Sequence, residues 1–185
     1  MNNSERFKIL MESGRTVFTP LDLRMLWRVN TLNAKISAMR MVEKSLIVRL
    51  ASGFYALNER YNRYELANRI VTPSYASFQS ALFYVGVNFQ AREEIASIAL
   101  RDQRKEVGNT LYTYVAMKKE LFFNSDGVVM REGASMALPE RAILDSLYFG
   151  YLPDIDDSGK LNKTYLAKLS LLYPKTVQKK AKAFL

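Results

Sequence analysis

The first 44 residues carry apolar positions at helical spacing and predict three short helices. The apolar sets are Phe7, Leu10 and Met11; then Leu21, Leu23, Leu26 and Trp27; then Leu32, Ile36 and Met39. The first helix is expected over residues 4–13. Thr19 followed by Pro20 is typical of the start of the second helix, because a hydroxyl caps the free amides and proline suits the first turn. The third helix is expected over residues 31–44.

The third predicted helix has two unlike faces when its residues are placed at 3.6 per turn. We expect Leu32, Ile36 and Met39 to form its buried stripe. The residues expected on the opposite side are Asn33, Ser37, Arg40, Met41 and Lys44. The helix is therefore predicted to present a polar and basic outer face.

The periodicity changes after residue 45 and favours a β-hairpin. Residues 46–50 and 54–57 are rich in β-branched and aromatic side chains, and Gly53 between them can adopt positive φ. Three helices followed by a hairpin are typical of a winged helix-turn-helix, in which the last helix enters the major groove and the hairpin forms the wing.

A second domain is expected after a polar stretch that begins at residue 58, which gives domains 1–58 and 59–185. Its pattern predicts helices over residues 64–70, 75–84 and 138–148, and strands over residues 94–100, 110–117, 121–123 and 128–130. The overall prediction is an α+β protein with an N-terminal winged helix-turn-helix, a mixed α/β second domain and a helical C-terminal tail.

The tail, residues 160–185, holds seven lysines and no acidic residue. Leu166, Leu169 and Leu172 lie at helical spacing within it. Its basic face is either a further DNA contact or a solvated helix surface, and the pattern slightly favours the solvated surface.

Composition narrows the classes of function. The chain has 27 basic and 18 acidic residues, a net charge of +9, and no histidine or cysteine. Disulfides, thiolate nucleophiles, Cys/His zinc sites and histidine-dependent triads are thereby excluded. No apolar run is long enough to span a membrane and the polar start lacks a signal peptide, so we expect a cytoplasmic protein with polyanionic partners, no cofactor and no metal.

The positive charge concentrates on the part of the chain predicted to contact DNA. Residues 24–50 hold six basic residues and one acidic residue, Glu43. Because arginine pairs with guanine and asparagine with adenine, Asn33, Ser37 and Arg40 are the candidates for base contacts. Further DNA-binding candidates, suited to phosphates or to the groove beside the wing, are Thr31, Lys35, Lys44, Arg49 and Ser52.

An enzymatic alternative would have to use carboxylates, lysines, serines or tyrosines, since histidine and cysteine are absent. A metal-dependent nuclease would use Asp102, Glu106 or Asp126. Residues 154–159 are similar to the start of a calcium loop, but Tyr165 occupies the position of the bidentate glutamate, which favours a polar turn. A protein-interaction adaptor is the third hypothesis.

Four segments resemble AbiEi-type antitoxins of type IV toxin-antitoxin (abortive infection) systems, in order and spacing. They are residues 44–57 (KSLIVRLASGFYAL), 64–67 (YELA), 73–82 (PSYASFQSAL) and 137–145 (ALPERAILD). The resemblance implies a non-enzymatic repressor whose N-terminal domain binds inverted repeats in its own promoter, with self-association on the DNA. It also implies that the second domain supports repression and neutralises a nucleotidyltransferase-like toxin without a stable complex. A winged-helix regulator without a toxin partner would show the same segments.

Overall fold

The N-terminal part of the chain forms a small helical unit with its own sheet. A computed structural model describes residues 1–185 as a mixed α+β fold with nine α-helices and two sheets. The N-terminal unit comprises α1 (Asn3–Glu12), β1 (Val17–Phe18), α2 (Pro20–Trp27), α3 (Thr31–Glu43), β2 (Val48–Ala51) and β3 (Phe54–Ala56). Its three strands are antiparallel in the order β1-β3-β2, so β3 lies between the other two.

The three helices of this unit begin where capping side chains satisfy their free amides. Asn2 and Thr19 each form a capping box, with Glu5 and Asp22 respectively. At α3, the side chain of Asn30 accepts a hydrogen bond from the backbone N–H of Asn33 at 2.8 Å. The three predicted helices are confirmed, with ends within one or two residues.

The cap of α3 gives a stability prediction. Replacement of Asn30 by alanine should lower the free energy of unfolding by about 1 kcal/mol, because the first turn of α3 loses the acceptor for one amide. Chemical denaturation measures the loss. Asn33→Ala on the same exposed turn is the control, and an equal loss in both variants would show that the cap is not the cause.

The C-terminal unit is built on a six-stranded mixed sheet. Its elements are α4 (Arg63–Ile70), β4 (Ser74–Ala76), α5 (Phe78–Tyr84), β5 (Glu94–Ala99), β6 (Gln103–Val107), β7 (Thr110–Ala116), α6 (Lys119–Phe122), β8 (Val128–Arg131), β9 (Ala134–Ala137), α7 (Pro139–Tyr148), α8 (Lys163–Ser170) and α9 (Lys175–Ala181). The strand order is β6-β7-β5-β4-β9-β8. The pairs β5/β7 and β4/β9 are parallel and the others are antiparallel.

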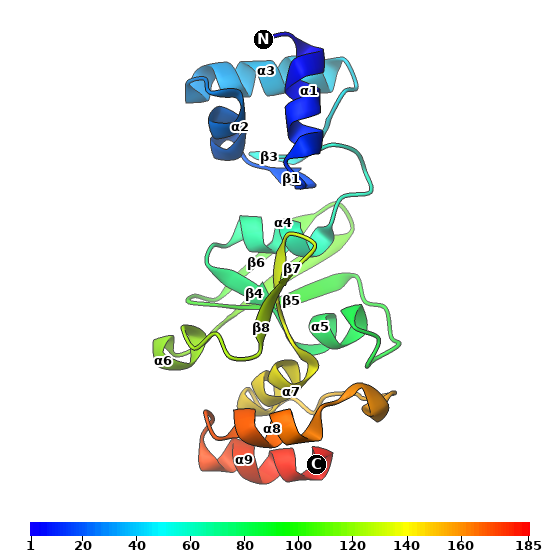
Figure 1. Cartoon of the computed structure of the whole chain (residues 1–185), viewed down its shortest axis with the longest axis vertical. Coiled ribbons are helices and arrows are strands. Elements are labelled where there is room, and N and C mark those ends of the chain that lie inside the picture. Colours follow the sequence, from blue (N-terminus) through cyan, green and yellow to red (C-terminus); the bar gives the residue numbers. More distant parts are fainter.

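Helices cover the two faces of this sheet differently (Figure 1). On one side α4 lies between the sheet and the N-terminal unit, and Leu66 and Ala67 of α4 share a core cluster with Tyr112 and Tyr114 of β7. On the other side α5 and α7 pack on the sheet, followed by α8 and α9 at the far end of the molecule. No helix combines the length and the apolar character needed to cross a bilayer.

A buried ionic cluster joins β4, α7 and the turn before α9. Nε of Arg141 lies 3.3 Å from a carboxylate oxygen of Asp145, and neither side chain is exposed. Asp145 also accepts hydrogen bonds from the hydroxyls of Tyr173 (2.6 Å), Ser77 (2.7 Å) and Tyr75 (3.2 Å). Burial and the adjacent carboxylate raise the pKa of Tyr75 and Tyr173, so both hydroxyls stay protonated and donate. The cluster thereby ties the helical layers to the sheet.

Two predicted elements of the C-terminal unit are wrong. Residues 75 and 76 were expected at the start of a helix, but they belong to β4, which pairs with both β5 and β9 in the middle of the sheet. Leu121 and Phe122 form the end of α6 and Phe123 is its C-terminal cap, so residues 121–123 are not a strand. Leu121 and Phe122 are both buried, while Phe123 is exposed. A strand would send adjacent side chains to opposite faces. The pattern also missed the strands β1, β6 and β9.

Candidate nucleic-acid interface

Helix α3 lies at the end of the molecule opposite to α8 and α9 (Figure 1). It packs on the rest of the N-terminal unit through Ala34, Ser37, Ala38 and Met41, all of which are buried. Three of these side chains are small, so the helix lies close to the large core residues that surround it. The opposite side of α3 faces solvent along its whole length.

The structure reverses part of the predicted assignment of faces on α3. Leu32, Ile36 and Met39, expected inside, are 66%, 38% and 53% exposed, whereas Ser37 is only 6% exposed. Met41 is buried as well. Three small residues and Met41, rather than Leu32, Ile36 and Met39, form the packing face of this helix. The prediction that Ser37 lies on the outer face is therefore wrong, and Ser37 is not in a position to contact DNA.

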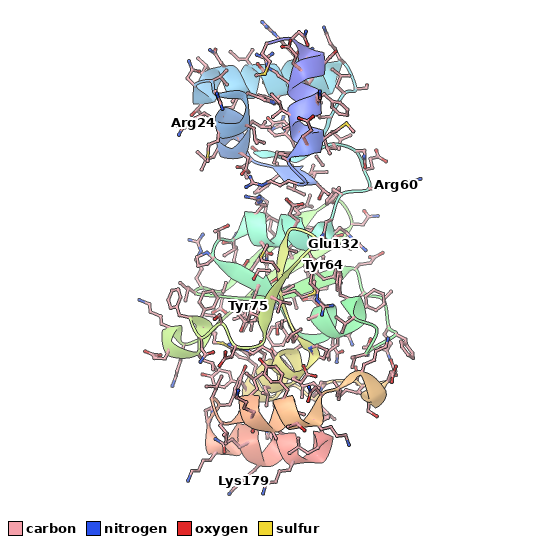
Figure 2. The ribbon with its side chains drawn as sticks, viewed as in Figure 1. Arg24, Arg60, Tyr64, Tyr75, Glu132 and Lys179 are labelled. Carbon is pink, nitrogen blue, oxygen red and sulfur yellow. The ribbon has the colours of Figure 1, made fainter.

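The other predicted contact residues lie on the surface of the N-terminal unit. Exposed positions on α3 and at its C-terminal end are Thr31, Asn33, Lys35, Arg40 and Lys44. Arg24 and Arg28, at the C-terminal end of α2, are exposed too, and Figure 2 shows Arg24 projecting from α2. None of these basic side chains forms an ion pair within the chain. Their charges are therefore available to an external anion.

The β2–β3 hairpin presents one polar edge to solvent and packs its other side on the C-terminal unit. Arg49 and Ser52 are exposed, and Gly53 in the turn has φ of +81° with open space around it. On the inner side, Phe54 packs in the core cluster of α4 and β7, and Nζ of Lys105 lies 4.6 Å above its ring. The hairpin is thus held against the C-terminal unit while its tip remains accessible.

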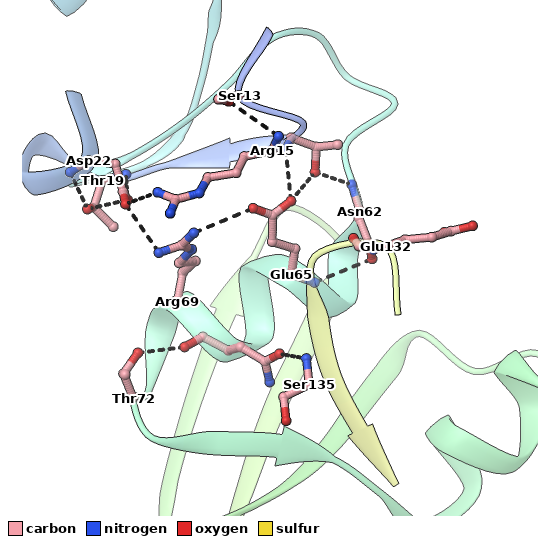
Figure 3. A network of polar contacts seen from close by, with 12 residues as sticks. Ser13, Arg15, Thr19, Asp22, Asn62, Glu65, Arg69, Thr72, Glu132 and Ser135 are labelled. Carbon is pink, nitrogen blue, oxygen red and sulfur yellow. Dashed lines mark hydrogen bonds and ion pairs between the residues drawn. The ribbon is translucent and has the colours of Figure 1, made fainter. Parts of the chain in front are cut away.

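A polar network fixes the N-terminal unit on α4 (Figure 3). The carboxylate of Glu65, which is 1% exposed, accepts hydrogen bonds from the backbone N–H and the hydroxyl of Thr16 at 2.8 and 2.7 Å. Arg69 lies 3.8 Å from Glu65 and 3.3 Å from Asp22, so one guanidinium connects the two units. The same Thr16 hydroxyl accepts a hydrogen bond from the backbone N–H of Asn62 at 2.9 Å.

These contacts were not predicted from the sequence. Glu65 lies within the segment 64–67 quoted for the resemblance, but no spacing rule relates it to Thr16, 49 positions earlier. Only the folded arrangement of β1 beside α4 brings the two residues together. Their hydrogen bonds hold β1, and with it the unit that contains α3, on α4.

The carboxylates considered for a nuclease lie at separate places in the C-terminal unit. Asp102 precedes β6 and accepts a hydrogen bond from the backbone N–H of Ala116 at 2.8 Å. Glu106 lies in β6, and Asp126 lies between α6 and β8. No group of three or more acidic side chains is arranged to hold a metal ion.

The acidic segment 154–159 uses its carboxylates for local contacts. Asp154 lies 3.5 Å from Arg92, and Asp156 accepts a hydrogen bond from the backbone N–H of Phe89 at 2.7 Å. Asp157 accepts from the N–H of Gly159 at 3.0 Å. These contacts account for the segment as a polar turn that joins α7 to α8.

The C-terminal lysines form a second basic surface, far from the first. Lys163 and Lys168 on α8 and Lys175, Lys179 and Lys180 on α9 are all exposed. Figure 2 shows Lys179 directed away from the body of the molecule, at the end opposite to Arg24. A single straight duplex lying along α3 would not reach this surface.

The comparisons with known proteins assign no family to the chain. No protein-family model matches the chain, and no curated protein matches its sequence. The resemblance to AbiEi-type antitoxins therefore stays a hypothesis that depends on the four segments named above.

Proposed function

We propose that the chain is a sequence-specific DNA-binding repressor whose N-terminal unit is a winged helix-turn-helix. The order α1-β1-α2-α3-β2-β3 with the sheet order β1-β3-β2 supports this assignment. The third helix is then the recognition helix, and the β2–β3 hairpin is the wing. Domain boundaries at 1–58 and 59–185 remain a prediction within this proposal.

The observation that carries the proposal is the exposed side of α3. It presents Lys35, Arg40 and Lys44 with no internal ion pairs, and the β2–β3 hairpin of the same unit presents Arg49. A helix of this kind can enter the major groove while flanking cations neutralise phosphates. Asn33 and Arg40 are the residues assigned to base edges, and Thr31, Lys35, Lys44, Arg49 and Ser52 to phosphates or the groove beside the wing.

The proposal includes autorepression and an antitoxin role, both taken from the resemblance. The chain would bind inverted repeats in the promoter of its own operon in the cytoplasm, self-associating there. The C-terminal unit would antagonise a nucleotidyltransferase-like toxin without a stable complex, and no catalytic activity, cofactor or metal is part of the proposal. Co-expression with the product of the adjacent gene tests the antitoxin role: failure to restore growth would leave a regulator without a toxin partner.

DNA binding is tested by footprinting the full chain on the region upstream of its gene. The proposal expects protection of an inverted repeat, since a dimer of winged helices contacts two half-sites. Absence of any protected repeat at low and moderate salt would contradict it. Cleavage of the duplex that depends on divalent metal would favour the nuclease alternative instead.

The location of the phosphate contacts can be tested with alanine substitutions at the two ends of the molecule. Lys44→Ala should weaken binding to all duplexes similarly and reduce the log–log salt slope by about 0.9, because one phosphate contact is lost. Arg40→Ala should instead relax base preference. Lys179→Ala, at the opposite end of the molecule, is the control and should change neither quantity. An equal reduction of the salt slope in Lys179→Ala would indicate that DNA binds the C-terminal lysines instead.

A further inference from the structure

The exposed side of α3 has an apolar centre. Leu32, Ile36 and Met39 follow one another at spacings of four and three, which places them within about 60° around the helix. Their exposed fractions are 66%, 38% and 53%, so none of them contributes fully to the core. Together they form a ridge, named here the apolar ridge, along the side of α3 that faces away from the protein.

Positive charges flank the apolar ridge on both sides. At 100° per residue, Lys35 lies on one side of Leu32 and Arg40 on the other. Both are exposed and without ion pairs within the chain. A partner that fits this surface has an apolar strip with groups that attract cations on both sides: phosphates near Lys35, and guanine acceptor atoms or phosphates near Arg40.

A second copy of the chain fits this surface poorly. A two-fold symmetric pairing through the ridge places the same patch on both copies and brings Lys35 and Arg40 of one close to those of the other. Glu43 is the only acidic residue on α3 that offsets this repulsion. Duplex DNA, in contrast, has phosphates on both rims of the major groove.

The floor of the major groove supplies the matching apolar group. An apolar side chain there distinguishes bases through the C5-methyl group of thymine. Leu32 lies in the first turn of α3 and Ile36 in the second, which is the part of a recognition helix that reaches base edges. We propose that Leu32, Ile36 and Met39 read thymine methyl groups and thereby select the operator. This inference rests on the proposed DNA-binding function.

The test compares duplexes that differ only in those methyl groups. The region upstream of the gene is synthesised with dTTP or with dUTP, and binding of the full chain is measured to each. The uracil duplex should bind about fourfold more weakly for each methyl group contacted. This fold-change corresponds to the burial of one methyl-sized apolar group. Equal affinity for the two duplexes would overturn the inference.

Variants connect the effect to the ridge. Ile36→Ala should weaken binding to the thymine duplex and reduce the difference between the two duplexes. Lys35→Ala should weaken binding to both equally, and Leu171→Ala, an exposed leucine after α8, should change neither. A thymine preference that survives Ile36→Ala, Leu32→Ala and Met39→Ala combined would also overturn the inference.

Two further results separate this inference from the function on which it rests. Specific binding without a thymine preference removes the methyl readout and leaves the repressor intact. Absence of binding to either duplex removes the repressor, and the inference with it. Loss of self-association in Ile36→Ala without DNA, measured by sedimentation, would assign the ridge to a second copy and overturn the methyl readout.

Discussion

Replacement of Asp145 by alanine should lower the free energy of unfolding by about 3–5 kcal/mol, the largest single-residue effect expected in this chain. The substitution leaves Arg141 buried without its counter-ion, and the hydroxyls of Tyr75, Ser77 and Tyr173 lose their shared acceptor. An uncompensated buried charge costs far more than a lost surface pair, because water cannot reach it. Urea denaturation followed by circular dichroism measures the change.

A matched acid and a double variant make this prediction specific. Asp154, half exposed and 3.5 Å from Arg92, is the control: Asp154→Ala should cost at most about 1 kcal/mol. Combining Asp145→Leu with Arg141→Met removes both charges and should recover part of the loss, because no unpaired ion remains. A loss below about 1 kcal/mol in Asp145→Ala would show that the cluster does not hold the helical layers on the sheet.

Replacement of Glu65 by alanine should reduce stability by about 3 kcal/mol and loosen the N-terminal unit from α4. The carboxylate is the shared acceptor for the N–H and hydroxyl of Thr16 and a partner of Arg69, and charged hydrogen bonds of this kind contribute about 1.5–3 kcal/mol each, not fully additively. Hydrogen exchange at the backbone amides of Thr16 and Asn62 should accelerate more than exchange within β5 and β7.

Conservative and exposed substitutions serve as the controls for Glu65. Glu65→Gln keeps an acceptor for Thr16 but loses the charge that pairs with Arg69, so an intermediate effect is expected. Glu59→Ala removes an exposed acid between the two units and should have little effect. Unchanged exchange at Thr16 in Glu65→Ala would mean that apolar packing of Val17 alone holds the N-terminal unit in place.

Local signals predicted the helical parts of the fold well. Capping residues such as Thr19 and Asn30 act within one turn, so their effect can be recognised from neighbouring residues alone. The strand β4 could not be recognised in this way. Tyr75 and Ala76 belong to a sheet because β5 and β9 approach from both sides, and those pairings join residues more than 20 positions apart.

The candidate interface was predicted in its charges but not in its apolar residues. Lys35, Arg40 and Lys44 lie outside as expected, since charged groups resist burial. The apolar stripe of α3 was assigned to the wrong side because the pattern assumes that the largest apolar residues lie inside. Here Ala34 and Ala38 pack inside, and the space is filled by bulky side chains from other elements, including Trp27 and Phe18.

The central claim, that α3 lies against duplex DNA, is tested most directly by site-specific cross-linking. The chain has no cysteine, so Asn33→Cys provides a single thiol on the exposed side of α3 for a photoreactive group. With the upstream duplex, this variant should form a covalent protein–DNA adduct, whereas the same group at Thr176→Cys on α9 should form none. Adducts from Thr176 with none from Asn33 would contradict the account.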